Sequence, residues 1–129
     1  MRPEKTEKPP DISVQGLAHI GDAVFELIVR TWLCSTGTSK AKNLHNRAVT
    51  LVSAKAQAIA AERIISELTA EETTIYKRGR NTHLNTIPKG STHEEYHAAT
   101  GLEALFGFLY ITGKTDRLNE LFNIIIEEH

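Results

Sequence analysis

The feature that most constrains the fold of this chain is a long stretch without proline in which hydrophobic residues recur every three or four positions. After Pro10 no proline occurs until Pro88. Hydrophobic residues at this spacing lie on one face of an α-helix, whereas a half-buried strand needs strict alternation. Strand-like alternation is absent from the sequence. The pattern therefore predicts an all-α fold.

Start and stop signals divide the stretch into separate helices. We expect a first helix over about residues 13–34, a second after Ser39, a third capped by Ser53 and a final one from about Thr115. The first helix is expected to bury one stripe, made of Leu17, Ile20, Val24, Leu27 and Ile28. The final helix is expected to bury Leu118, Leu121, Phe122 and Ile125.

Two further helix starts carry a Thr followed three residues later by a Glu. Thr69 with Glu72 and Thr92 with Glu95 are possible capping boxes, in which each side chain bonds the other residue's backbone N–H. The first begins a short helix, and the second begins a long helix that Gly113 is expected to end.

The length of 129 residues and a hydrophobic content of 40% suit one compact domain, expected over residues 13–129. Residues 1–12 are polar and rich in proline, which predicts a flexible leader. The formal net charge of −1 gives no general attraction to nucleic acid. Any such binding must therefore depend on local clustering of basic residues.

The cellular compartment is constrained by the single cysteine, Cys34, which has no second cysteine to pair with. The chain opens without a charged segment followed by an apolar one, so secretion is not expected. Charged residues interrupt every apolar run, which also argues against a membrane span. We expect a cytoplasmic protein, with Cys34 in its core.

Two acids, Asp22 and Glu103, stand in segments that are otherwise suited to burial. On a helical wheel each lies at the rim of the hydrophobic face. Gly21 and Gly101 precede them, although glycine inside a helix costs about 1 kcal/mol relative to alanine. Close approach of two helices at these glycines would bring the carboxylates together, where they could hold a cation such as Mg²⁺. The alternative is that each acid only meets solvent or pairs with an arginine.

Four segments together resemble a known family. "GDAVFEL" (21–27) and "ATGLEALFGFLY" (99–110) resemble the two acidic helices of the ribonuclease III catalytic domain. "NLHNRAVTLVSAKAQA" (43–58) and "KRGRN" (77–81) resemble its small bacterial subfamily, Mini-ribonuclease III, which lacks a separate double-stranded RNA-binding domain. The resemblance spans about residues 14–110.

This resemblance implies a homodimer that cleaves double-stranded RNA with Mg²⁺, with Mn²⁺ able to substitute, and leaves 5′-phosphate ends. Asp22 and Glu103 match the catalytic, metal-binding acids of the family. Larger relatives carry further acids one turn earlier, where this chain has Ala18 and Thr100, which leaves the number of metal ions open. The subfamily implies maturation of precursor 23S ribosomal RNA.

A basic segment lies between two acidic ones, because residues 73–93 contain no Asp or Glu. We expect a flexible loop over residues 79–91 that contacts the phosphate backbone of RNA, which proteins bind mainly through its shape, phosphates and 2′-hydroxyls. The alternative is a charged loop that only meets solvent. The candidate RNA-binding residues are Lys77, Arg78, Arg80, Asn81 and Lys89.

Two other functions stay open on the sequence. "HEEYH", residues 93–97, matches the H-E-x-x-H pattern of zinc hydrolases, with Glu103 as a possible third ligand. A non-catalytic helical module for RNA binding or dimerisation would have the same fold without needing both acids.

Overall fold

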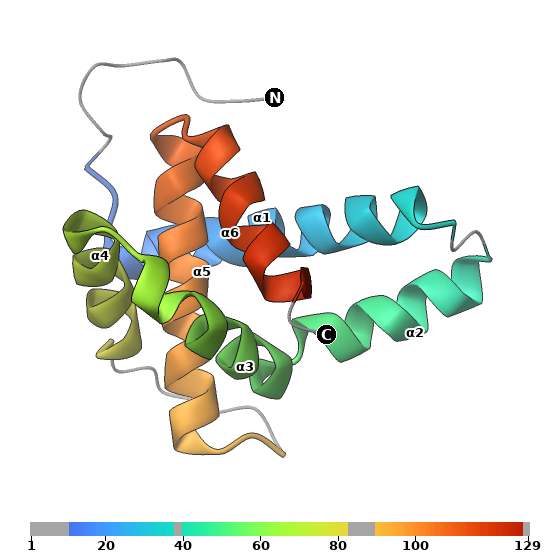
Figure 1. Ribbon diagram of the computed structural model, residues 1–129. Helices are drawn as coiled ribbons and strands as arrows, with labels where there is room; N and C mark the ends of the chain where they lie inside the picture. The colour runs from blue at the N-terminus through green and yellow to red at the C-terminus, as the bar shows by residue number, and fades with distance from the viewer. Residues whose placement is uncertain (1–10, 38–39, 83–89, 128–129) are drawn as a thin grey trace.

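The computed structural model describes residues 11–37, 40–82 and 90–127, and within these ranges it contains helices and no strands. The predicted all-α fold is confirmed (Figure 1). The helices are α1 (Val14–Ser35), α2 (Ala41–Val52), α3 (Ala54–Ile64), a short 3₁₀ helix η1 (Ile65–Glu67), α4 (Ala70–Arg80), α5 (His93–Ile111) and α6 (Thr115–Glu127).

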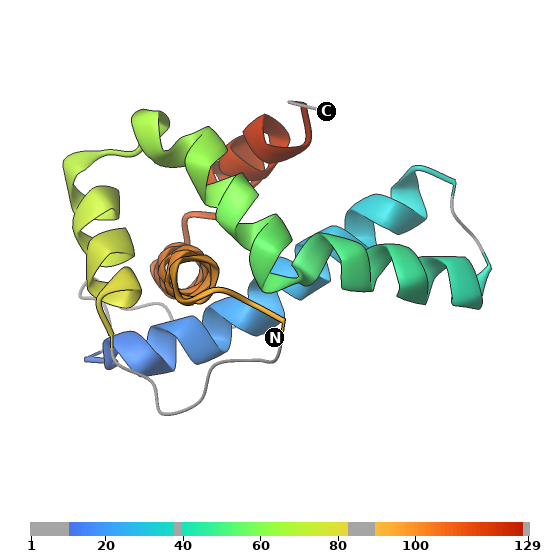
Figure 2. The same ribbon diagram turned by 90° about the horizontal axis from the view of Figure 1, so that it is seen from below.

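Helix α5 forms the centre of the molecule. It packs against α1, α3, α4 and α6, and Figure 2 shows it nearly end-on with these helices around it. Between Ala99 and Leu109 every residue except Glu103 is buried, so this stretch is covered on all sides, unlike an amphipathic surface helix. The side chains that are fully excluded from solvent are Leu102, Ala104, Leu105, Phe106 and Leu109.

The second half of α1 and the whole of α2 form an arm. These two helices pack against each other and extend away from the other helices (Figures 1 and 2). We refer to this pair, residues 26–35 and 41–52, as the α1–α2 arm. Its surface is accessible on more sides than that of the helices around α5, so it can contact another molecule.

Helix ends follow the local signals of the sequence. Ser13 and Ser53 accept hydrogen bonds from backbone N–H groups in the first turns of α1 and α3. Both predicted capping boxes form, at Thr69 and at Thr92. Gly113 has a φ of 75° and its N–H bonds the carbonyl of Tyr110, as expected for a glycine that ends a helix.

The crossing of α1 over α5 brings the backbones of the two helices into contact. A Cβ atom at Gly21 would lie 1.6 Å from the carbonyl oxygen of Glu103, and one at Gly107 would lie 2.0 Å from that of Leu17. No side chain other than a hydrogen atom fits at either position. The prediction that Gly21 allows two helices to approach closely is confirmed.

Three expectations about packing are wrong. Gly101 faces Tyr76 of α4 instead of α1, because the glycine that meets Gly21 lies at position 107. Leu27 is 65% exposed, since the buried stripe of α1 passes through Phe25 and Val29 and leaves position 27 on the outer side. Cys34 is exposed rather than in the core, because it lies at the far end of the arm.

An ion pair that the sequence did not reveal joins α6 to α4. Arg117 donates two hydrogen bonds of 2.9 Å to the buried carboxylate of Glu72 and one of 2.7 Å to the carbonyl of Glu67. Hydrogen bonding to Arg117 is the main reason that the pKa of Glu72 lies below its ordinary value. Because Glu72 also bonds the N–H of Thr69, the same carboxylate caps α4 and fixes it to α6.

We predict that Gly21→Ala destabilises the protein by about 3 kcal/mol or more, at the upper end of the usual cost of overpacking. The added methyl group would collide with backbone of α5, which cannot move aside as a side chain can. Thermal and urea unfolding measure the loss. Gly16→Ala is the control, because its Cβ would meet only the Ile12 and Ser13 side chains. Equal effects of the two substitutions would contradict the backbone contact.

Candidate active site

The two predicted catalytic acids line one cavity of about 250 Å³ between α1 and α5. Asp22 comes from α1 and Glu103 from α5. Residues three or four positions apart share a helical face, so each helix contributes one row of side chains to the cavity. Beside the two acids the lining residues are Gln15, Ala18 and His19 of α1 and Tyr96 and Thr100 of α5.

The crossing at Gly21 explains why the acids meet. Gly21 touches the backbone of Glu103, so Asp22, the next residue, is carried to the edge of the same contact. Asp22 is exposed and Glu103 is half-buried. The site is thus open to solvent on the side of α1 and enclosed on the side of α5.

The electrostatics of the pair are unfavourable without a cation. Burial, followed by the negative charge of Asp22 and a hydrogen bond with Asp22, raises the pKa of Glu103 to about 8, while a hydrogen bond from Gln57 acts in the opposite direction. Two carboxyl groups this close do not ionise together at low cost. A bound cation would remove that cost.

A divalent metal ion with few protein ligands fits these residues. The described part of the chain contains no group of three or more His, Cys, Asp or Glu side chains that could hold a metal. Mg²⁺ is commonly bound through one or two carboxylates, with water and phosphate oxygens as its other ligands. Ala18 and Thr100 line the cavity without adding a carboxylate, so the other ligands of such an ion would be water or phosphate oxygens.

Gln57 is the residue near this site that sequence reasoning missed. It lies on α3, is only 2% exposed and hydrogen-bonds Glu103. A signal was present, because Gln57 shares the buried face of α3 with Ala60, Ala61 and Ile64, where a long polar residue is unusual. His19 and Tyr96, which line the cavity, were also not assigned to the site.

The candidate RNA-binding residues lie on a helix rather than in the expected loop. Lys77, Arg78 and Arg80 occupy the last turn of α4, and Asn81 caps it. All four are exposed, and Lys89 falls outside the described residues. We call the segment 77–81 the basic turn.

Gly79 does not supply flexibility to the basic turn. It is buried, and a Cβ there would lie 2.7 Å from Ala104 and 3.1 Å from the carbonyl of Thr100. The glycine instead lets α4 approach α5 beside Glu103. The basic turn therefore lies along the same stretch of α5 that supplies one acid of the site.

The zinc interpretation of "HEEYH" finds no support in the described residues. His93 and His97 lie in the first turns of α5 with ring centroids 6.4 Å apart, and no third ligand joins them in a group able to hold a metal. Glu103 instead lies with Asp22. The motif matches the pattern without forming its site.

Comparison with known proteins agrees with this geometry. Residues 15–114 match the model of the ribonuclease III domain. The chain is 42% identical to Mini-ribonuclease 3 of Enterococcus faecalis, covering 87% of this chain and 86% of the relative, and 39% identical to that of Staphylococcus aureus, covering 85% and 84%. The crystal structure of protein FN1578 from Fusobacterium nucleatum superposes with a TM-score of 0.84 at 34% identity, covering 92% of this chain and 95% of that one.

The fold, the paired acids and these similarities define the class of protein: the chain belongs to the ribonuclease III family. Within the family its similarity is to the Mini-ribonuclease 3 proteins, and it is an endoribonuclease. Enzymes of this family generally depend on a divalent metal ion. In the described ranges no helix is both long and hydrophobic enough to span a membrane.

We predict that Glu103→Gln stabilises the metal-free protein at alkaline pH. The pKa of Glu103 is about 8 in the folded chain and about 4.5 when unfolded, so the stability of the parent protein falls as pH rises from 4.5 to 8. The glutamine variant lacks this loss. Melting temperatures in EDTA should therefore be equal near pH 4 and higher for the variant above pH 8. A parent protein that is the more stable at pH 9 would disprove the unfavourable pairing of Asp22 and Glu103.

Proposed function

We propose that this endoribonuclease hydrolyses phosphodiester bonds of double-stranded RNA with Mg²⁺ held by Asp22 and Glu103, and that Mn²⁺ can replace Mg²⁺. The observation that carries the proposal is the pair of carboxylates from two crossing helices in one open cavity. When bound, the metal ion lowers the pKa of a coordinated water and stabilises the charge that develops on the phosphate.

Each acid has a distinct part in this proposal. Glu103, enclosed by α5 and α3, fixes the ion from the protein side, and exposed Asp22 completes the pair on the side where RNA arrives. Both act as metal ligands rather than as a general acid and a general base, because they lie side by side instead of on opposite sides of a substrate.

In this proposal the basic turn binds the phosphate backbone of the RNA. Lys77, Arg78 and Arg80 are exposed on α4, beside the stretch of α5 that carries Glu103. Their charges can bind phosphates and offset the repulsion between RNA and the two acids. Lys89, which lies outside the described residues, is proposed as a further RNA-binding cation.

The natural substrate we propose is precursor 23S ribosomal RNA, in the cytoplasm. The support is the similarity to Mini-ribonuclease 3 proteins over most of the chain. A ribosomal RNA precursor offers the long helical stems that an endonuclease for double-stranded RNA requires.

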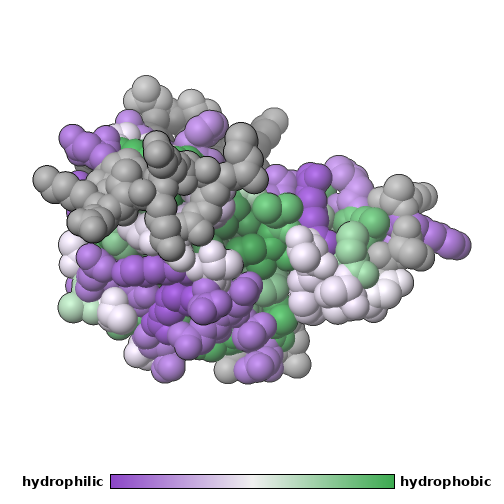
Figure 3. Space-filling model, turned by 90° about the horizontal axis from the view of Figure 1, so that it is seen from above, coloured by the Kyte–Doolittle hydropathy of each residue, from purple (hydrophilic) through white to green (hydrophobic). Residues whose placement is uncertain are grey.

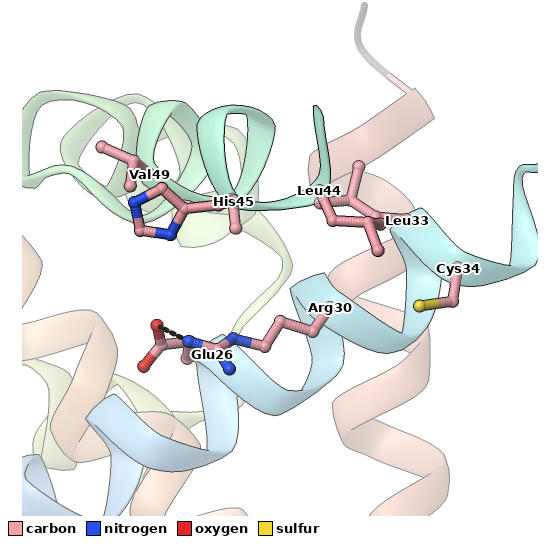
Figure 4. A pocket seen from close by; sticks show the side chains of 8 residues that line it. Glu26, Arg30, Leu33, Cys34, Leu44, His45 and Val49 are labelled. Atoms are coloured by element: carbon pink, nitrogen blue, oxygen red, sulfur yellow. Dashed lines mark hydrogen bonds and ion pairs between the residues drawn. The ribbon is translucent and has the colours of Figure 1, made fainter. Parts of the chain in front are cut away.

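We further propose that the enzyme is a homodimer, joined through the α1–α2 arm. Leu27 and Val49, at 65% and 53%, are the two most exposed large hydrophobic side chains of the described residues, and both lie on the arm. Val49 also lines a cavity of about 300 Å³ between the two helices of the arm, where His45 and Val49 of α2 face Glu26 and Arg30 of α1 (Figure 4). Figure 3 shows a hydrophobic band between the arm and the rest of the molecule. A two-fold pair would align two sites with the two strands of a duplex.

The nuclease proposal predicts that purified protein cuts a long, uniformly labelled double-stranded RNA with Mg²⁺ and not with EDTA. Asp22→Asn should lower the cleavage rate by at least 100-fold, because the site would lose one of its two metal-binding carboxylates. Binding of RNA, measured by gel shift in Ca²⁺, should persist. Cleavage by Asp22→Asn at the parent's rate would refute the site.

For the basic turn we predict that Arg78→Ala combined with Arg80→Ala weakens RNA binding and makes it less sensitive to salt. Each lost phosphate contact reduces the slope of log affinity against log salt by about 1. Fluorescence anisotropy at several salt concentrations measures this slope. Lys55→Ala, an exposed cation on α3, serves as the control. An unchanged slope in the double variant would remove the basic turn from the RNA surface.

The dimer proposal predicts that Leu27→Glu shifts the protein from dimer to monomer in sedimentation equilibrium, because a carboxylate would be buried in an apolar contact. Ile65→Glu is the matched control, since Ile65 is 48% exposed but lies on η1, outside the arm. Dimers of unchanged affinity in Leu27→Glu would exclude this face of the arm as the interface.

A further inference from the structure

We propose that Gln57 is the positioning residue that orients the Glu103 carboxylate for metal binding. The inference deepens the proposed function and rests on it, because it assumes that Asp22 and Glu103 hold the ion. Gln57 itself neither touches RNA nor ligates the metal in this proposal.

The burial of Gln57 requires a reason. It is 2% exposed, on a face of α3 whose other members are Ala60, Ala61 and Ile64. Burying an amide costs free energy unless its hydrogen bonds are made, and a Leu or Met would serve packing alone better. Gln57 has no fully buried polar atom without a partner, and its amide interacts with the Glu103 carboxyl as a hydrogen-bond donor.

Gln57 contacts Glu103 from outside the cavity in which the metal ion would bind. Glu103 lines the cavity, and Gln57 does not. Gln57 reaches Glu103 from α3, while Asp22 reaches it from α1 on the cavity side. A carboxylate has two oxygens, so one can be held by the amide N–H while the other faces Asp22 and the space for an ion.

The side chain of Gln57 is uncharged, which suits a residue that holds a metal-binding carboxylate. The side chains that act on Glu103 are Asp22 and Gln57, and neither of them carries a positive charge. An arginine or lysine at position 57 would hold the carboxylate as firmly but would neutralise it and compete with the ion. An amide orients the carboxylate and leaves its full charge for a divalent cation. Hydrogen-bond partners of this kind change metal affinity by about 10- to 100-fold when removed.

The experiment compares the parent protein with Gln57→Met, which keeps the length and flexibility of the side chain and loses both donors. Binding of Mn²⁺ is measured by electron paramagnetic resonance without RNA. The cleavage rate is measured against Mg²⁺ concentration. We expect the Mn²⁺ dissociation constant and the half-maximal Mg²⁺ concentration to rise by about 10- to 100-fold. The maximal rate should return at saturating Mg²⁺, and RNA affinity in EDTA should not change.

Ile64→Val is the control for lost stability, because it trims the same buried face of α3 and costs about 1 kcal/mol without removing a hydrogen bond. Its metal affinity should equal the parent's. If Gln57→Met does not fold, Gln57→Asn is used instead, since it keeps an amide that is one methylene too short to reach Glu103.

Unchanged Mn²⁺ affinity in the folded Gln57 variant would overturn the inference. So would a lower maximal rate that excess Mg²⁺ fails to restore, because that result indicates general damage to the site. A parent protein that binds Mn²⁺ through Glu103 but cuts no RNA would refute the nuclease proposal and still test Gln57. A parent protein that binds no Mn²⁺ would overturn both.

Discussion

The backbone contact between α1 and α5 is the constraint on which the rest of the structure depends. Gly21 and Gly107 let the two helices meet with no side chain between them. This contact sets the depth at which α1 crosses the central helix, and it places Asp22 directly beside Glu103. A helix pair held apart by ordinary side chains would be 8–10 Å from axis to axis, and its carboxylates would be further apart. Packing and chemistry thus depend on the same two glycines.

The acid pair of Asp22 on α1 and Glu103 on α5 lowers the stability of the metal-free protein. Glu103 has its pKa raised to about 8 because it is enclosed and lies beside a second acid. Glu72, a buried carboxylate elsewhere in the chain, differs from Glu103, because it has Arg117 as its partner and its pKa is lowered. Perturbed acids without a cationic partner are typical of functional sites rather than of structural ones. By this criterion Glu72 is a structural acid, and Glu103 belongs to a functional site of the same small domain.

Most of the fold could be predicted from local signals, because capping residues and three-to-four spacing act within one turn of a helix. The two acids were also predicted, since each interrupts a segment suited to burial. Contacts between helices could not be predicted from such local signals. The partner of Gly21 proved to be Gly107, Gly79 packs against α5 instead of bending a loop, and Gln57 reaches a helix 46 residues further along the chain. Each of these depends on how helices cross, which periodicity within one helix does not specify.

The charge distribution connects the acid pair to its substrate. RNA and the two acids carry the same sign of charge, so an endonuclease of this design must attract phosphate elsewhere before it can place it near the acids. A net charge of −1 supplies no such attraction. In the function proposed above the basic turn does so locally, and Gly79 lets that turn pack against the stretch of α5 next to Glu103. No residue of the basic turn lines the cavity, so an RNA bound there would have to continue along α5 to reach the acids, where a cation held by Asp22 and Glu103 would offset their repulsion of a phosphodiester.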